Sequence, residues 1–151
     1  MKILDIFYNK PLLTSVMAFF IAQMIKIIPG VIINKKIPWD RVMGTGGMPS
    51  SHTAGVCALF TSLGIKHGFA STEFAISFVF ASIIMYDATG IRYAAGEHAQ
   101  VLNHIMENLH EAMKEGIQHI KLKTLLGHTH GQVWLGAILG ICVALISYYF
   151  F

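Results

Sequence analysis

Long apolar segments separated by short polar stretches make up most of this chain. The candidates for membrane helices are residues 11–33, 52–68, 69–88 and 134–151. An apolar helix of about 20 residues crosses the hydrocarbon core of a bilayer, whereas the short second segment is also compatible with a buried core helix. That segment is rich in small residues, which favour close helix packing inside a membrane bundle. The pattern predicts one domain over residues 1–151, an all-α, polytopic helical bundle with about four spans.

Residues 91–120 follow a different pattern, because apolar positions recur there at helical spacing with polar residues between them. This is the period of an amphipathic helix, and we expect it to lie on the membrane face or over the mouth of the bundle. His104, Glu107 and Glu111 share one face of that helix. A metal site there is conceivable, but the face lacks a full ligand set, so a solvated polar face is the preferred interpretation.

The amino acid composition agrees with a membrane location. The chain is 54% hydrophobic and 13% charged, whereas a soluble domain has about 25% charged residues. A net charge of +3 is too small to argue for nucleic acid and suits a membrane protein with basic flanks. Cys57 and Cys142 lie inside apolar runs, so we interpret them as small buried residues rather than as a disulfide or metal ligands.

Gln23 and Lys26 interrupt the first apolar segment, as does the pair Pro29-Gly30. A lysine inside a membrane span is a candidate functional residue. Lys26 is only about two turns from the end of the segment, so snorkelling of its ammonium group to the interface is the preferred interpretation.

Between the first two apolar segments lies a glycine-rich polar stretch, Gly44-Thr45-Gly46-Gly47-Met48-Pro49-Ser50-Ser51-His52. Glycines allow several backbone N–H groups to converge on one anion, and Ser50 or Ser51 can cap the helix that follows. The positive N-terminal end of that helix favours a phosphate-like group, and a histidine beside it can exchange a proton. The simpler alternative is a helix cap after a flexible loop.

The order of the spans places the 34–51 loop and the 89–133 region on the same side of the membrane. His52 and His128 then face each other there, together with four basic residues, Lys36, Arg41, Arg92 and Lys123. One imidazole can attack phosphorus, the other can protonate the leaving group, and the basic side chains can stabilise the transferred phosphoryl group. We therefore expect phosphoryl transfer without a metal or other cofactor.

Basic residues also predict the orientation of the chain. Seven Lys and Arg residues lie on the side of the two polar regions and three lie on the other side. The positive-inside rule then places the polar site in the cytoplasm.

Three motifs in order resemble a known family. Pro49-Ser50-Ser51-His52 is similar to the central Pro-Ser-Gly-His motif of the type 2 phosphatidic acid phosphatase superfamily, which includes vanadium-dependent haloperoxidases. Together with Met-Tyr-Asp-Ala-Thr-Gly-Ile-Arg and Leu-Leu-Gly-His-Thr, it resembles the divergent small membrane branch of that superfamily, over roughly residues 11–145.

The resemblance implies a role for each matching residue. His52 would be the general acid and His128 the nucleophile, while Ser50, Ser51 and the backbone at Gly47 would bind phosphate oxygens. Lys123 stands where the third motif has arginine, and Lys36 with Arg41 loosely matches the first motif, although Val42 replaces its proline. Apart from the resemblance, Arg92 is a candidate phosphate-binding residue because the order of the spans places it on the same side of the membrane.

One departure concerns the residue that orients the nucleophile. The third motif has an aspartate four residues after its histidine, and here that residue is Gln132. Asp87 would supply the missing carboxylate if the end of the third span lay beside His128. The resemblance thus implies a phosphatase acting on a lipid phosphate or pyrophosphate, or a non-catalytic protein that binds or transports a phosphorylated lipid. Four spans are few for this superfamily, so self-association is a further hypothesis.

Overall fold

The structure is a computed structural model that describes residues 3–35, 47–113, 122, 124 and 127–150. Its elements are one short 3₁₀ helix, η1 (Ile3–Tyr8), followed by the α-helices α1 (Lys10–Asn34), α3 (Ser51–His67), α4 (Thr72–Thr89), α5 (Ile91–Met113) and α6 (His130–Phe150). The described residues contain no strand. The prediction of an all-α membrane bundle is confirmed.

The helix ends follow from the local sequence. Asn9 caps α1, Ser50 caps α3 and Ser71 caps α4, each accepting a hydrogen bond from a backbone N–H of the first turn. Gly68 ends α3 with φ of 88°, a conformation that costs glycine little. Pro29-Gly30 does not break the first helix, because α1 continues to Asn34.

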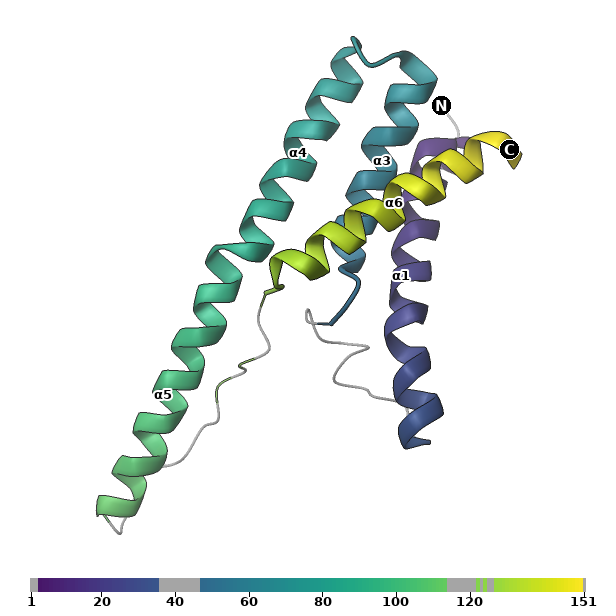
Figure 1. Cartoon of the computed structure of the whole chain (residues 1–151). Coiled ribbons are helices and arrows are strands. Elements are labelled where there is room, and N and C mark those ends of the chain that lie inside the picture. Colours follow the sequence, from purple (N-terminus) through teal and green to yellow (C-terminus); the bar gives the residue numbers. More distant parts are fainter. Residues whose placement is uncertain (1–2, 36–46, 114–121, 123, 125–126, 151) are drawn as a thin grey trace.

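Helix α3 lies at the centre of the bundle and packs against α1, α4 and α6, and α6 lies across both α3 and α1 (Figure 1). Small residues form these contacts. A side chain added at Gly140 of α6 would collide with the carbonyl oxygen of Ala54, and the hydroxyl of Ser15 in α1 donates a 2.9 Å hydrogen bond to the carbonyl oxygen of Gly55. The helices therefore approach at backbone distance, as membrane helices with small residues do.

Large apolar side chains mostly face outward from this small-residue core. Examples are Phe20, Ile76, Phe80 and Trp134, each more than half exposed. Three described helical runs are long and apolar enough to cross a membrane, Lys10–Ile28, Thr72–Leu109 and His130–Phe150. The 17 residues of α3 are not among them, and the count of four spans stays a prediction.

Helix α5 continues the direction of α4 beyond the rest of the bundle (Figure 1). Among the described helices it contacts α4 alone. Its sequence is amphipathic, as expected, but it does not fold back over the mouth of the bundle. Asn103 is buried and holds the backbone of Leu122 through two hydrogen bonds, from its Nδ2 to the Leu122 carbonyl and from the Leu122 N–H to its Oδ1.

Candidate active site

Two of the three predicted motifs are joined directly at the end of the bundle where α3 and α6 begin, which we call the polar end. The backbone N–H of Ser50 donates a 3.0 Å hydrogen bond to the carbonyl oxygen of Gln132. The hydroxyl oxygen of Ser50 also accepts hydrogen bonds from the N–H and the hydroxyl of Thr53. Ser50 and Ser51 are almost completely buried. The start of α3 is thus fixed against the start of α6.

The second motif reaches the same place through α4. The backbone N–H of His128 donates a 2.9 Å hydrogen bond to the carbonyl oxygen of Ala88, in the last turn of α4. Gly127, just before this histidine, has φ of 83° and lies so close to the backbone of Arg92 and Tyr93 that a side chain would collide with it. Glycine is required at this close approach. All three predicted motifs therefore meet at the polar end.

The imidazole of His128 is 95% buried and is held from one side. Its Nδ1 lies 3.0 Å from Oε1 of Gln132, which also accepts a hydrogen bond from the N–H of Thr129. Because Oε1 is an acceptor, Nδ1 carries the proton and Nε2 of the neutral ring carries the lone pair. Nε2 is buried and has no hydrogen-bond partner among the described residues.

Lys26 is the residue of this site that the sequence interpretation missed. Its side chain is 3% exposed and does not snorkel to the interface, because Nζ donates a 3.2 Å hydrogen bond to the hydroxyl of Ser51. The stem of Lys26 also lies near Gly47, where an added Cβ would be 3.6 Å from Cδ.

A sequence signal for this burial exists. Thr14, Ala18, Ala22 and Lys26 recur at intervals of four along α1, so they share one helix face, and all four are buried. Lys26 therefore continues the small-residue face of α1 rather than its lipid-facing side.

His52 lies in the first turn of α3 and is exposed. Its ring meets Phe19 of α1 edge to face, with 5.6 Å between the centroids.

Burial lowers the pKa of His128 below its ordinary value of 6.5. The hydrogen bond to Gln132 raises this pKa, whereas the charges of Lys26, His52 and Arg92 lower it further. The two histidines and two of the cations are therefore close enough to interact electrostatically.

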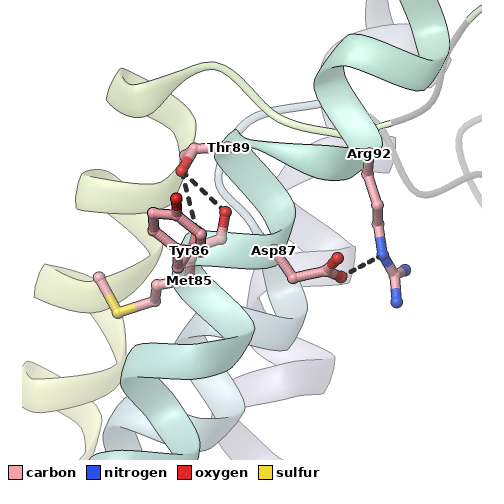
Figure 2. A network of polar contacts seen from close by, with 5 residues as sticks. All are labelled: Met85, Tyr86, Asp87, Thr89 and Arg92. Atoms are coloured by element: carbon pink, nitrogen blue, oxygen red, sulfur yellow. Dashed lines mark hydrogen bonds and ion pairs between the residues drawn. The ribbon is translucent and has the colours of Figure 1, made fainter.

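Asp87 and Arg92 form an ion pair across the junction of α4 and α5. Arg92 Nε lies 2.5 Å from Asp87 Oδ2, and Figure 2 shows the two side chains reaching toward each other. On the same turn Thr89 donates back to the carbonyl oxygens of Met85 and Tyr86. The end of the third span does lie beside His128, but the described partner of the Asp87 carboxylate is Arg92 rather than the imidazole.

The remaining predicted residues are placed as follows. Gly47 has φ of 95°, a backbone conformation that favours glycine, and lies beside Lys26 as described. Lys36, Arg41 and Lys123 lie outside the described residues. No group of three histidine, cysteine or acidic residues that could hold a metal occurs in the described part of the chain, and His104 bonds Asn108 on the exposed face of α5.

An apolar cavity of about 490 Å³ adjoins the polar end between α3, α4 and α6. Phe60, Phe78, Ala81 and Ile141 line its deeper part, and Thr89 and His130 line it near the site. Thr89 follows Ala88, whose carbonyl oxygen accepts the hydrogen bond from the N–H of His128, so this cavity is lined by a residue next to the site and extends along α4 and α6.

Comparisons with known proteins agree with the three motifs. The model of a family described as "Divergent PAP2 family" matches residues 7–143. A protein of Bacillus subtilis (strain 168) named "Uncharacterized membrane protein YuiD" is 41% identical over 157 aligned positions, which cover 98% of this chain and 99% of that protein. No solved structure matches the chain.

Proposed function

This chain belongs to the divergent PAP2 family, and from that membership and the geometry of its polar end we propose that it is a membrane phosphatase. The proposed substrate is a lipid phosphate or pyrophosphate. The observation that carries the proposal is the state of His128, whose Nδ1 is held by Gln132 while its buried Nε2 has no described partner. A buried lone pair among positive charges is suited to attack phosphorus.

In the proposed reaction, Nε2 of His128 attacks the phosphorus atom while the bond from phosphorus to the lipid oxygen breaks. His52 donates a proton to that leaving oxygen. Water then attacks the phosphorylated histidine and gives a proton to His52, the bond from phosphorus to nitrogen breaks, and inorganic phosphate leaves. His128 and His52 return to their starting protonation states.

Positive charge for the transferred group comes from two described residues on different helices. Lys26 reaches the start of α3 from α1, and Arg92, at the junction of α4 and α5, acts on His128 through its charge. Cations already in place where charge develops stabilise a transition state without reorganisation of solvent. The hydroxyl of Ser51, which accepts from Lys26, lies at the N-terminus of α3, where the helix dipole favours an anion.

A lipid rather than a soluble phosphate is supported by the cavity between α4 and α6. The lining of this cavity is mainly apolar. One lining residue, Thr89, follows Ala88, whose carbonyl oxygen accepts the hydrogen bond from the N–H of His128. A phosphate group at the polar end would leave a hydrocarbon chain directed into this cavity, where burial of each methylene stabilises binding by about 0.8 kcal/mol.

A second function is binding or transport of a phosphorylated lipid without hydrolysis. It is favoured by the two residues from which a carboxylate beside His128 was expected, Gln132 and Asp87. Gln132 is neutral, and Asp87 pairs with Arg92. Neither residue therefore offers His128 a negative charge that would stabilise the imidazolium, as the aspartate of a catalytic triad does.

The polar end faces the cytoplasm in this proposal. Its side of the chain carries seven basic residues, Lys35, Lys36, Arg41, Arg92, Lys114, Lys121 and Lys123, and the other side carries Lys2, Lys10 and Lys66. The positive-inside rule supports this orientation.

The two functions are separated by phosphate release from a panel of lipid phosphates and pyrophosphates, with purified wild type, His128→Ala and His52→Ala. Hydrolysis by wild type that is lost in both variants supports the phosphatase. If wild type releases no more phosphate than His128→Ala for any lipid, hydrolysis is excluded. Stabilisation of the inactive protein by vanadate or phosphate would then support binding.

A further inference from the structure

The ion pair between Asp87 and Arg92 crosses a break between two helices that otherwise follow one another. Gly90, between α4 and α5, has φ of −101° and ψ of −93°, which departs from the values of an α-helix. In an unbroken helix, residues five apart are separated by about 140° around the axis and do not share a face. The turn at Gly90 therefore allows the guanidinium of Arg92 to meet the carboxylate of Asp87 (Figure 2).

Both members of this ion pair are anchored to the segment that carries the proposed nucleophile. Ala88, next to Asp87, accepts the 2.9 Å hydrogen bond from the N–H of His128. The backbone of Arg92 lies against Gly127, where an added Cβ would be 2.7 Å from the carbonyl carbon of Arg92. The carboxylate and the guanidinium are thus held beside His128 through the backbone next to each of them.

Only part of the guanidinium of Arg92 is used by the ion pair. Its Nε donates to Oδ2 of Asp87. A guanidinium carries five N–H donors in a planar fork, so this bond leaves those of Nη1 and Nη2. Neither Nη atom has a hydrogen-bond partner within the described part of the chain. Two such donors in one plane match the oxygens of a phosphoryl group.

The ion pair is exposed to solvent. The side chains of Arg92 and Asp87 are 56% and 34% exposed. Exposed ion pairs contribute little to folding stability, because water solvates both charges and the side chains lose rotamer freedom. We therefore expect the carboxylate to act on the arginine rather than on the fold. Without the carboxylate, a ligand would itself have to immobilise the arginine, and this cost weakens binding.

The two cations of the proposed site are held in different ways. Lys26 is 3% exposed, so burial among the helices fixes it. Arg92 is exposed, and its described partner is Asp87. Burial lowers the pKa of His128 most, and the charge of Arg92 lowers it too, so this charge reaches the proposed nucleophile. A cation stabilises a transition state best when it is fixed before charge develops, and for Arg92 the ion pair supplies that fixation.

We propose that Asp87 is a positioning residue, which holds Arg92 through Nε so that Nη1 and Nη2 meet the oxygens of a phosphoryl group at the polar end. This role rests on the proposed function, because it assumes a phosphate group beside His128, but it applies to hydrolysis and to binding alike. Asp87 thus acts on Arg92 and not on the imidazole. An effect through charge alone has the opposite sign, because removal of a carboxylate near an anion strengthens binding of the anion.

The test measures the affinity of the purified full chain in detergent for orthovanadate. The variants are Asp87→Ala, the charge-retaining Asp87→Glu, Arg92→Ala and the double variant Asp87→Ala/Arg92→Ala. Glu73→Ala removes an exposed carboxylate from the first turn of α4 and is the matched control. Thermal unfolding without ligand shows that each variant is folded, and phosphate release from lipid phosphates is measured on the same proteins.

We expect Asp87→Ala to weaken vanadate binding by about 3-fold to 10-fold, the cost of immobilising one long side chain. Arg92→Ala weakens it by about 10-fold to 100-fold, the loss of charged hydrogen bonds. Asp87→Glu and Glu73→Ala stay within about 2-fold of wild type, and Asp87→Ala causes no further loss once Arg92 is absent.

The proposal is overturned if Asp87→Ala leaves vanadate affinity unchanged or raises it, if its loss persists in the Arg92→Ala background, or if wild type binds no vanadate. Phosphate release decides separately on the phosphatase. If wild type binds vanadate but hydrolyses no lipid phosphate, the phosphatase fails, and the affinities of the variants still decide whether Asp87 positions Arg92.

Discussion

Nδ1 of His128 and Oε1 of Gln132 lie 3.0 Å apart, and this hydrogen bond determines which nitrogen of the imidazole is free to react. The N–H of Thr129 also donates to Oε1, which fixes the amide with its oxygen toward the ring. Gln132 thereby performs one of the two tasks of a triad carboxylate, because it holds the proton on Nδ1. It does not perform the other, which is to stabilise the positive ring.

The pH dependence of hydrolysis follows from that division. Attack requires neutral His128, whose pKa lies below 6.5, and protonation of the leaving oxygen requires His52 in its protonated form. The rate of hydrolysis therefore passes through a maximum with pH, and its acid limb lies below the pH expected for an ordinary histidine. Gln132→Glu adds a negative charge and raises the pKa of His128, so the acid limb moves up by about 1 unit or more. Gln132→Ala removes the hydrogen bond, so the acid limb moves down and the maximal rate falls.

Rate profiles of kcat/KM from pH 4 to 8 for the three proteins check this prediction. Acid limbs that superimpose would show that the residue at position 132 does not control the reacting group.

The same depressed pKa of His128 affects the stability of the fold. The unfolded chain binds the proton of His128 more readily than the folded chain, so its contribution to stability is lost as the pH falls below 6.5.

Lys26→Met separates binding from folding. The methionine has a similar length but no charge, so we expect affinity for phosphate or vanadate to fall by about 10-fold to 100-fold, the loss of one charged hydrogen bond. Stability without ligand should not fall, because the substitution removes a charge from a 97% buried position. Ligand titration and thermal unfolding of this variant beside Lys35→Met, at the exposed lysine that follows the last residue of α1, measure both quantities. Unchanged phosphate affinity would remove Lys26 from the site.

The contact of α6 with α3 requires glycine. Gly140→Ala places a methyl group against the carbonyl oxygen of Ala54, and we expect it to lower the free energy of unfolding by about 1–3 kcal/mol. Gly131→Ala, in the first turn of the same helix, meets open space and should raise that free energy by as much as about 0.5–1 kcal/mol. Reversible unfolding in detergent compares the two, and equal effects would contradict the close approach of the backbones.

Chain length of the substrate tests the apolar cavity. Ser82 lines it and is exposed, so Ser82→Trp should fill the cavity with little cost to folding. We expect kcat/KM for a long-chain lipid phosphate to fall about 10-fold or more, and that for a short-chain phosphate with the same head group to stay within about 2-fold. Ile83→Trp, at an exposed neighbouring position outside the cavity lining, is the matched control. An equal loss for both substrates in Ser82→Trp would count against a tail in this cavity.

The sequence predicted the helices better than the contacts between the residues proposed for the site. Apolar length and period predicted helical segments, because burial in lipid constrains every turn of a membrane helix. The cap at Ser50 followed from residue type, because a hydroxyl satisfies the free N–H groups of the first turn. The pairing of Asp87 with Arg92 depends on how α4 continues into α5, which no local pattern encodes.

Lys26 shows why the remaining contacts of the site could not be predicted from the sequence. Whether a lysine near the end of a span snorkels or points inward depends on the rotation of the helix about its axis. In α1 that rotation is set by packing of Ala18 and Ala22 against α3 and α6. Local hydropathy treats both outcomes alike, and only the four-residue spacing of the buried face distinguishes them.

The most direct test of the central claim, that Nε2 of His128 attacks phosphorus, is the position of vanadate in a structure of the complex. Vanadate adopts the geometry of a phosphoryl group in transfer. The account predicts that vanadium lies at bonding distance from Nε2 of His128, with His52 on the opposite side and Lys26 within hydrogen-bond distance of an equatorial oxygen. Vanadate bound at the polar end without a bond to His128, or held by other residues, would contradict it.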